Sequence, residues 1–252
     1  RTTRVLELLD PPVDRIPFDE AWYAYARFNP IYRERFGMNG DPAQHQGPTL
    51  FATHSTHKLL AALSQASFIH VRDGRSPIDH ARFNESFMMH ASTSPLYSII
   101  ASNDISAAMM EGPGGLALTT ESIQEAVAFR QTVGRIRKEL VGRGEWFFAT
   151  WNADEVTDPT SGRRLPFEDA PETLLVTEPD CWVLHPGDAW HGFADLEDGY
   201  CMLDPIKVSV VTPGIASDGA LEERGIPASL VTAYLDAHGI PHEATRQPHR
   251  AQ

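Results

Sequence analysis

One stretch decides the fold class: Thr49-Leu-Phe-Ala-Thr-His-Ser-Thr-His-Lys-Leu-Leu-Ala-Ala-Leu63. Residues 49–53 are rich in β-branched and aromatic side chains, which is typical of a strand, and the run from Leu59 to Leu63 favours a helix. The sequence therefore predicts that Lys58 lies near a turn between a strand and a helix.

A second strand is predicted over Arg15-Ile-Pro-Phe18, which would deliver Asp19 at its carboxyl end. The next segment is rich in aromatic residues, and a third strand is predicted over residues 67–71, before the turn dipeptide Asp73-Gly74. Because ligands of open α/β sheets gather at the carboxyl ends of strands, Asp19 becomes a candidate functional residue. The first half of the chain is therefore predicted to have a strand-rich core with short helices.

The second half is predicted to be α+β. A long helix is expected from Thr119, with apolar residues on one face and Gly142 after its end, and Gly112-Pro-Gly-Gly115 is interpreted as a turn between subdomains. Strands are predicted over 146–148, 173–176, 181–184 and 206–211.

The predicted domains are residues 1–112, residues 113–240 and an atypical tail over 241–252. From His242 the chain becomes polar and rich in His, Arg and Pro, so this end is expected to be disordered or non-native in origin.

Composition excludes several classes of protein. The 252 residues carry a formal net charge of −13, which argues against binding of a nucleic-acid backbone. The sequence has no apolar run long enough to span a membrane and no signal peptide, so neither a membrane partner nor secretion is expected. Only Cys181 and Cys201 are present, without a CxxC pair, so no disulfide framework is expected and a reducing cytoplasm fits best.

Lys58 is the candidate nucleophile. A lysine that forms an imine must reach its partner from a rigid element and be partly neutral, and nearby hydroxyls and helix-start N–H groups could hold a phosphate. The alternative is an ordinary surface lysine on an amphipathic helix. Asp19 also has a purely structural alternative role, because aspartate at a strand end often caps a turn or a helix.

A metal site is a weaker interpretation. His54 and His57 form an HxxH pattern, but zinc requires three or four converging ligands. The Gly112–Gly115 segment lacks the Lys and Ser/Thr of a phosphate-binding P-loop, so it is not expected to hold a nucleotide. No metal is therefore predicted.

Several segments together resemble the bacterial ornithine, lysine and arginine decarboxylases. The resemblance covers nearly the whole chain up to Gly239, and the sequence after Asp19 is most similar to the biodegradative, acid-inducible arginine branch of that family. It implies an α/β fold, with part of an aspartate-aminotransferase-like, pyridoxal-phosphate-dependent large domain followed by an α+β subdomain. The segments that carry it are Phe18–Tyr32, Ala52–Ser67, Met88–Tyr97, Trp182–Phe193 and Met202–Ser209.

The resemblance also implies the site residues. Lys58 would hold pyridoxal 5′-phosphate through an imine, and Asp19 would pair with the pyridine nitrogen. The other implied contacts are Ala21 on the ring, Trp22 near the phenolic oxygen, Ser55 and His57 at the phosphate, and Ser92 reaching the phosphate from a neighbouring subunit. The family implies an obligate homodimer and a higher homo-oligomer in the full-length protein.

The implied reaction is decarboxylation of a basic amino acid, with L-arginine giving agmatine and CO2, and with Lys58 or His57 returning the proton. Lysine and ornithine are the alternative substrates. An inactive fragment or a regulatory homologue is an alternative of another class, and a histidine-based metal hydrolase is a third. Family members are much longer, so the chain is expected to be an internal fragment that is inactive when isolated.

Overall fold

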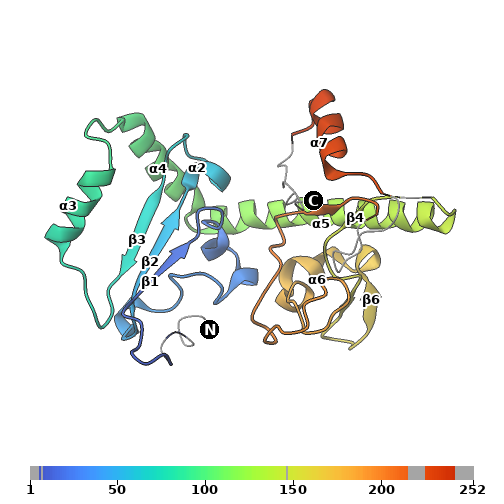
Figure 1. Cartoon of the computed structure of the whole chain (residues 1–252), viewed down its shortest axis with the longest axis horizontal. Helices are drawn as coiled ribbons and strands as arrows, with labels where there is room; N and C mark the ends of the chain where they lie inside the picture. The colour runs from blue at the N-terminus through green and yellow to red at the C-terminus, as the bar shows by residue number, and fades with distance from the viewer. Residues whose placement is uncertain (1–5, 7, 146, 215–224, 242–252) are drawn as a thin grey trace, which may run out of the picture. The chain divides into compact units, whose positions relative to one another are not determined.

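The computed structural model describes residues 6, 8–145, 147–214 and 225–241. The chain divides into two compact units, residues 1–122 and 123–252, and each unit is described by itself. Figure 1 labels the main elements along the chain. No helix in the described ranges is long and apolar enough to cross a membrane.

The first unit is built on a three-stranded sheet. Its strands are β1 (Arg15–Asp19), β2 (Thr49–His54) and β3 (Phe68–Arg72), and β2 lies between the other two (Figure 1). Strand β2 is parallel to β1 and antiparallel to β3. The three strands predicted for this half of the chain are therefore confirmed.

Alternating apolar residues explain how the sheet contributes to the core. Ile16, Leu50 and Ala52 are buried, while Arg15, Pro17, Phe51 and Thr53 beside them are more exposed. Tyr23, Tyr25 and Tyr32 pack edge to face against one another, with ring centroids 5.5–5.7 Å apart. This tyrosine cluster follows β1 and belongs to the short 3-10 segments η1 (Ala26–Phe28) and η2 (Pro30–Tyr32) or lies close to them.

The helix after β2 is shorter than predicted. Helix α2 (Thr56–Leu59) is one turn long, so the expected continuation through Leu63 is wrong. The segment beyond it is held by tertiary contacts instead, because Leu63 donates its backbone N–H to Ser102 Oγ at 3.1 Å. This contact with α4 (Tyr97–Met110) takes precedence over local helix propensity.

The remaining helices of this unit are α3 (His80–His90) and α4, and the predicted helical character of residues 96–110 is confirmed. Asp79 caps α3 by accepting a hydrogen bond from Arg82 N–H at 2.9 Å. Residues 42–44 form a further 3-10 segment, η3 (Pro42–Gln44).

The long helix begins earlier than predicted. Helix α5 spans Pro113–Gly142, so the expected start at Thr119 and the expected turn at Gly114-Gly115 are wrong. Proline at the first helical position explains the earlier start, because its fixed φ suits a helix. Gly115 is needed for packing, since a Cβ there would lie 3.1 Å from two atoms of Phe28 and even closer to the carbonyl oxygen of Met110.

The second unit combines helices with small antiparallel ladders, which agrees with the predicted α+β class. Strand β4 (Ala149–Thr150) pairs with β7 (Val210–Val211), and β5 (Glu155–Thr157) pairs with β6 (Arg164–Pro166). The other elements are η4 (Phe167–Asp169), α6 (Glu172–Thr177), η5 (Pro179–Cys181) and α7 (Ala228–Ala237).

Most strand predictions in this unit are wrong. Residues 173–176 lie in α6, because Pro171 precedes a helical turn that buries Leu175 and Val176. The predicted strand at 181–184 is reduced to the end of η5 and one bridge between Val183 and Met202. Of the predicted strand at 206–211, only Val210 and Val211 pair in a ladder. Of the predicted strand at 146–148, Phe147 and Phe148 lie outside strands, and Trp146 lies outside the described residues. The predicted tail from His242 also lies outside them.

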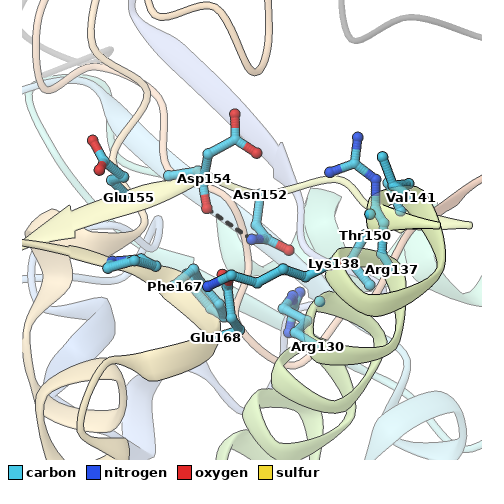
Figure 2. A pocket seen from close by; sticks show the side chains of 15 residues that line it. Arg130, Arg137, Lys138, Val141, Thr150, Asn152, Asp154, Glu155, Phe167 and Glu168 are labelled. Atoms are coloured by element: carbon cyan, nitrogen blue, oxygen red, sulfur yellow. Dashed lines mark hydrogen bonds and ion pairs between the residues drawn. The ribbon is translucent and has the colours of Figure 1, made fainter. Parts of the chain in front are cut away.

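Arg130 and Trp182 form the centre of the second unit, and both are 1% exposed. The Arg130 guanidinium lies 4.9 Å from the Trp182 ring centroid and donates to the carbonyl oxygens of Pro205 at 2.6 Å and Lys207 at 2.7 Å. A cavity of about 500 Å³ borders Arg130, and Lys138 pairs with Glu168 at its wall (Figure 2).

Candidate active site

Strands β1 and β2 end at the same edge of the sheet. The parallel register places Asp19 opposite Thr53, and Glu20 donates its backbone N–H to the Thr53 carbonyl at 3.1 Å. The residues that follow both strands therefore come together, as expected for the carboxyl ends of parallel strands.

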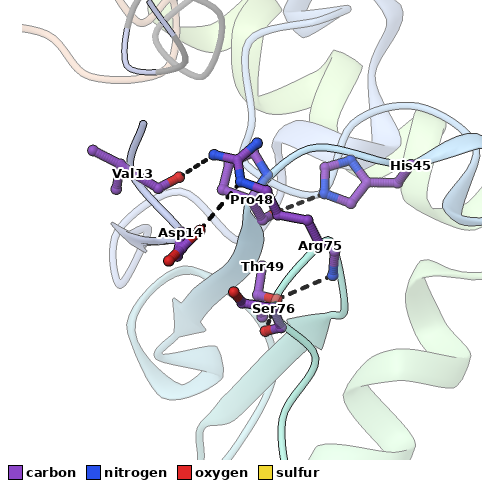
Figure 3. Close-up of polar contacts among 8 residues, drawn as sticks. Val13, Asp14, His45, Pro48, Thr49, Arg75 and Ser76 are labelled. Atoms are coloured by element: carbon purple, nitrogen blue, oxygen red, sulfur yellow. Dashed lines mark hydrogen bonds and ion pairs between the residues drawn. The ribbon is translucent and has the colours of Figure 1, made fainter. Parts of the chain in front are cut away.

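The opposite end of β2 is fixed by polar contacts. Thr49 Oγ1 donates to the Ser76 carbonyl at 2.6 Å and accepts from Gly74 N–H at 3.0 Å, while a ring nitrogen of His45 contacts the Pro48 carbonyl at 2.7 Å (Figure 3). Arg75 pairs with Asp14 at 3.2 Å. These contacts fix the start of β2 to the loops beside it.

Lys58 lies in α2 and is half-buried. Its Nζ lies 4.7 Å from the ring centroid of Trp22, a residue of the segment that follows β1. Thr56, buried in the same helical turn, donates to Asn103 Oδ1 of α4 at 2.5 Å. Lys58 is thus carried by a turn that is fixed to α4 and contacts the segment after β1.

Lys58 differs from the chain's other lysines, Lys138 and Lys207. Lys138 pairs with Glu168 and Asp169, and its pKa is raised chiefly by the hydrogen bond to Glu168. Lys207 pairs with Asp204 at 3.4 Å. Within the described residues, no carboxylate lies in ion-pair distance of Lys58.

Asp19, the last residue of β1, is exposed at the sheet edge. One carboxylate oxygen, Oδ1, accepts a hydrogen bond from Ala21 N–H at 3.1 Å. Oδ2 has no hydrogen-bond donor within the described part of the chain. Asp19 can therefore accept a further donor, such as a protonated ring nitrogen.

Ser55 and His57 flank the start of α2. The Ser55 side chain makes no capping hydrogen bond, which leaves its hydroxyl able to bind a ligand. His57 Nδ1 lies 2.8 Å from the Ala66 carbonyl oxygen, so Nδ1 carries the hydrogen and Nε2 is left for other chemistry. Because α2 is only one turn long, the expected phosphate stabilisation by aligned helix N–H groups would be small.

Ser92 is separate from this group of residues. It lies in the segment between α3 and α4, where its Oγ accepts a hydrogen bond from Ser94 N–H at 3.1 Å. By contrast, Asp19, Ala21, Trp22, Ser55, His57 and Lys58 all follow the ends of β1 and β2 or stand at them. The role of Ser92 across a subunit interface stays a prediction.

The structure also joins residues whose relation the sequence did not reveal. Glu20, which is 7% exposed, binds His54 through an Oε2–Nε2 contact of 2.8 Å, and the His54 and His70 rings lie 4.7 Å apart. The pKa of His70 is lowered, chiefly by burial and then by the nearby His54. These three residues line a cavity of about 290 Å³.

His54 was singled out by its HxxH spacing with His57, but the two imidazoles have different partners. His54 bonds Glu20, while His57 bonds the Ala66 carbonyl. In the part of the chain that the structure describes, no group of three or more His, Cys, Asp or Glu side chains is arranged to hold a metal ion.

Comparison with known proteins identifies relatives over almost the whole chain. A family model described as "Orn/Lys/Arg decarboxylase, major domain" matches residues 1–248. The biodegradative arginine decarboxylase of Escherichia coli is 60% identical over 234 residues, which are 93% of this chain and 31% of that protein. A lysine decarboxylase of Pseudomonas aeruginosa is 47% identical over 242 residues, or 96% of this chain and 30% of the relative.

Solved structures agree with these matches. A Pseudomonas aeruginosa lysine decarboxylase has a TM-score of 0.78 at 46% identity, covering 93% of this chain and 29% of that one. The Escherichia coli constitutive lysine decarboxylase has a TM-score of 0.72 at 42% identity, covering 92% and 29%. This chain thus spans a little under a third of the length of these relatives. The family resemblance and the α/β fold class predicted from the sequence are confirmed, and the chain belongs to the Orn/Lys/Arg decarboxylase major-domain family.

Proposed function

We propose that this chain supplies the cofactor-binding lysine and part of the active site of a pyridoxal-phosphate-dependent decarboxylase that converts L-arginine to agmatine and CO2. The observation that carries the proposal is the position of Lys58. It has no carboxylate partner among the described residues, and its Nζ lies beside Trp22, three residues after Asp19.

The residues at this edge fit the proposed cofactor chemically. Lys58 offers an amine for the aldehyde, and Asp19 has a carboxylate oxygen available for the pyridine nitrogen. Ser55 offers a hydroxyl, and His57 a ring nitrogen, for the phosphate. Ala21 would pack on the ring, Trp22 would lie near the phenolic oxygen, and Ser92 would reach the phosphate from a second subunit.

When bound, pyridoxal phosphate supplies a protonated ring that withdraws electrons from the bond to the departing carboxylate. The role of Asp19 would be to keep a proton on the ring nitrogen, because a neighbouring carboxylate favours the protonated, positively charged nitrogen. The Trp22 ring centroid lies 4.7 Å from the Lys58 Nζ, and this contact would orient the lysine side chain toward the segment that follows β1.

Lys58 and His57 are the candidates for returning a proton to the substrate carbon. Lys58 can carry the proton on Nζ. His57 can carry it on Nε2, because Nδ1 is occupied by the Ala66 carbonyl and keeps the ring oriented. Replacement of His57 by Gln would separate these roles, since the amide cannot transfer a proton in this way.

Arginine is favoured over lysine and ornithine by the order of similarity. The chain is 60% identical to an arginine decarboxylase, 47% to one lysine decarboxylase and 31% to the constitutive ornithine decarboxylase of Escherichia coli. Lysine is the second candidate, because the solved structures matched at 46% and 42% identity are lysine decarboxylases.

Assembly into homodimers and higher homo-oligomers is part of the proposal. Apolar side chains beside Ser92 are exposed in the single chain: Met89 is 81%, Leu96 62% and Tyr97 84% accessible. An apolar surface of this kind favours burial against another subunit, which would bring Ser92 to the partner's phosphate site.

The cofactor proposal is tested by adding pyridoxal phosphate to the chain and recording its visible absorbance before and after borohydride reduction. Wild type, Lys138→Ala and Lys207→Ala should develop an absorbance band that reduction removes, whereas Lys58→Ala should not. Equal bands in folded Lys58→Ala and wild type would refute the assignment.

The reaction is tested by replacing the matching 234-residue segment of the Escherichia coli arginine decarboxylase with the corresponding segment of this chain. The chimera should release CO2 from arginine and lose this activity on Lys58→Ala. Release from lysine or ornithine in preference to arginine would support the alternative substrates.

A further inference from the structure

A part-buried hydrogen bond between a carboxylate and an imidazole links the two strands whose ends carry the proposed cofactor residues. Glu20 follows β1 directly, and His54 is the last residue of β2. Glu20 Oε2 lies 2.8 Å from His54 Nε2, and Glu20 and His54 side chains are 9% and 17% exposed. A buried carboxylate is costly unless it is hydrogen-bonded, so this pair strongly favours one arrangement of the two strand ends.

The other carboxylate oxygen of Glu20 is fixed as well. Oε1 accepts the backbone N–H of Gly37 at 2.6 Å. Gly37 can approach this closely because it has no side chain: a Cβ there would lie 2.6 Å from Cδ2 of Phe18. Arg72 Nη2 holds the same loop by donating to the Met38 carbonyl at 2.6 Å. Glu20 is therefore held by β2 on one oxygen and by this loop on the other.

Both members of the pair are sequence neighbours of proposed cofactor residues. Glu20 immediately follows Asp19, and His54 immediately precedes Ser55. The backbone hydrogen bond from Glu20 N–H to the Thr53 carbonyl, at 3.1 Å, lies at the end of the β1–β2 ladder. The Glu20–His54 pair adds a second, side-chain link between β1 and β2 at the point where both strands end.

We propose that Glu20 and His54 are positioning residues that set the separation between Asp19 and the Ser55–Lys58 segment. The inference rests on the proposed function. Neither residue is assigned to the cofactor or to the substrate, so the pair acts through its neighbours. Loss of Glu20 or His54 would leave the sheet intact but allow Asp19 and Lys58 to move apart.

A double-mutant cycle tests this coupling in the whole chain. Glu20→Ala, His54→Ala and the double variant are compared with wild type for affinity toward pyridoxal phosphate, measured by absorbance. Each single variant should bind on the order of ten-fold more weakly, as when outer partners that orient ligand-binding side chains are removed. The double variant should lose no more than the singles, because the two residues act as one unit.

Two further variants separate positioning from general stability. His54→Gln keeps a donor for the Glu20 carboxylate and should restore most of the affinity. Asn29→Ala is the matched control: Asn29 is buried in the same unit and donates to Thr119 and Thr120 at 3.2 Å, remote in sequence from the pair. It should lower thermal stability while leaving cofactor affinity unchanged.

Hydrogen exchange without cofactor supplies a readout independent of the proposed function. Glu20→Ala should accelerate amide exchange over residues 19–23 and 55–58, whereas Asn29→Ala should not. If wild type binds the cofactor and both single variants bind equally well, the positioning role is refuted while the proposed function stands. If wild type does not bind the cofactor, the function fails for this chain, and unchanged exchange in Glu20→Ala would also refute the pair's role.

Discussion

At the scale of single residues, environment separates side chains of the same type. Lys58 lies against Trp22 with no carboxylate partner among the described residues, whereas Lys138 and Lys207 are ion-paired. The two cysteines differ in the same way. Cys181 is 6% exposed, and burial, with smaller contributions from Glu178 and Asp180, raises the pKa of its thiol to about 12. Cys201 is half-buried.

This difference predicts selective thiol labelling. The thiolate is the reactive form, so Cys181 should react slowly with an aromatic disulfide reagent at pH 8 under native conditions. Cys201→Ser should remove the fast phase, and Cys181→Ser should leave it unchanged. A fast phase retained in Cys201→Ser would contradict the buried position of Cys181.

At the scale of elements, prediction succeeded where the local pattern and the tertiary contacts agree. The strands at β1, β2 and β3 are long enough for residue type and alternation to identify them. In the second unit the ladders contain only two or three residues, and the apolar run at 173–176 is compatible with either a strand or a helix. Pro171 and the burial of Leu175 and Val176 determine the helical outcome.

The candidate site shows the same division. Asp19 and Lys58 were predicted at the strand ends because sequence position alone places them there. The sequence does not predict the Glu20–His54 pair. The pair depends on the register between β1 and β2 and on the approach of Gly37, and both involve residues that are far apart in the sequence. The one-turn length of α2 also depended on tertiary contacts, here with α4.

Helix α4 contains a buried hydroxyl that predicts a stabilising substitution. Ser106 is 1% exposed, and its Oγ has no hydrogen-bond partner within the described residues. Desolvation of an unpaired hydroxyl disfavours the folded state, so Ser106→Ala should increase the free energy of unfolding by about 1 kcal/mol. Chemical denaturation followed in the first unit measures the change. A loss of stability of similar size would show that the hydroxyl contributes a favourable interaction.

The loops of the second unit contain a pH-dependent contact. His185 lies 2.7 Å from Asp198 and 3.4 Å from Asp180, and its pKa is raised chiefly by the hydrogen bond to Asp198. The folded state therefore binds a proton more tightly than the unfolded state. The resulting stability is fully present below the unfolded pKa of about 6.5 and is lost as pH rises through the folded pKa.

His185→Gln should consequently destabilise the second unit more at pH 5.5 than at pH 8. Because the His185 side chain is 39% exposed, the difference should stay below about 1 kcal/mol. Hydrogen exchange in residues 180–203 at both pH values measures it. The opposite order, with a larger effect at pH 8, would contradict the assigned sign.

At the scale of the whole molecule, the chain combines a sheet that carries the proposed cofactor residues with an α+β unit built around Arg130 and Trp182. It spans 31% of the length of the Escherichia coli arginine decarboxylase, and the family membership extends over both units. The exposed apolar side chains near Ser92 fit a proposed larger assembly in which this surface is covered.

The central claim is that Lys58 holds the cofactor, and the most direct test is to locate the attachment by mass spectrometry. The chain is treated with pyridoxal phosphate, reduced with borohydride and digested, and the modified peptides are quantified. We predict that the phosphopyridoxyl group is found mainly on Lys58, at a cofactor concentration that leaves Lys138 and Lys207 unmodified. Equal modification of the three lysines, or preferential modification of Lys138 or Lys207 in the folded chain, would contradict the account.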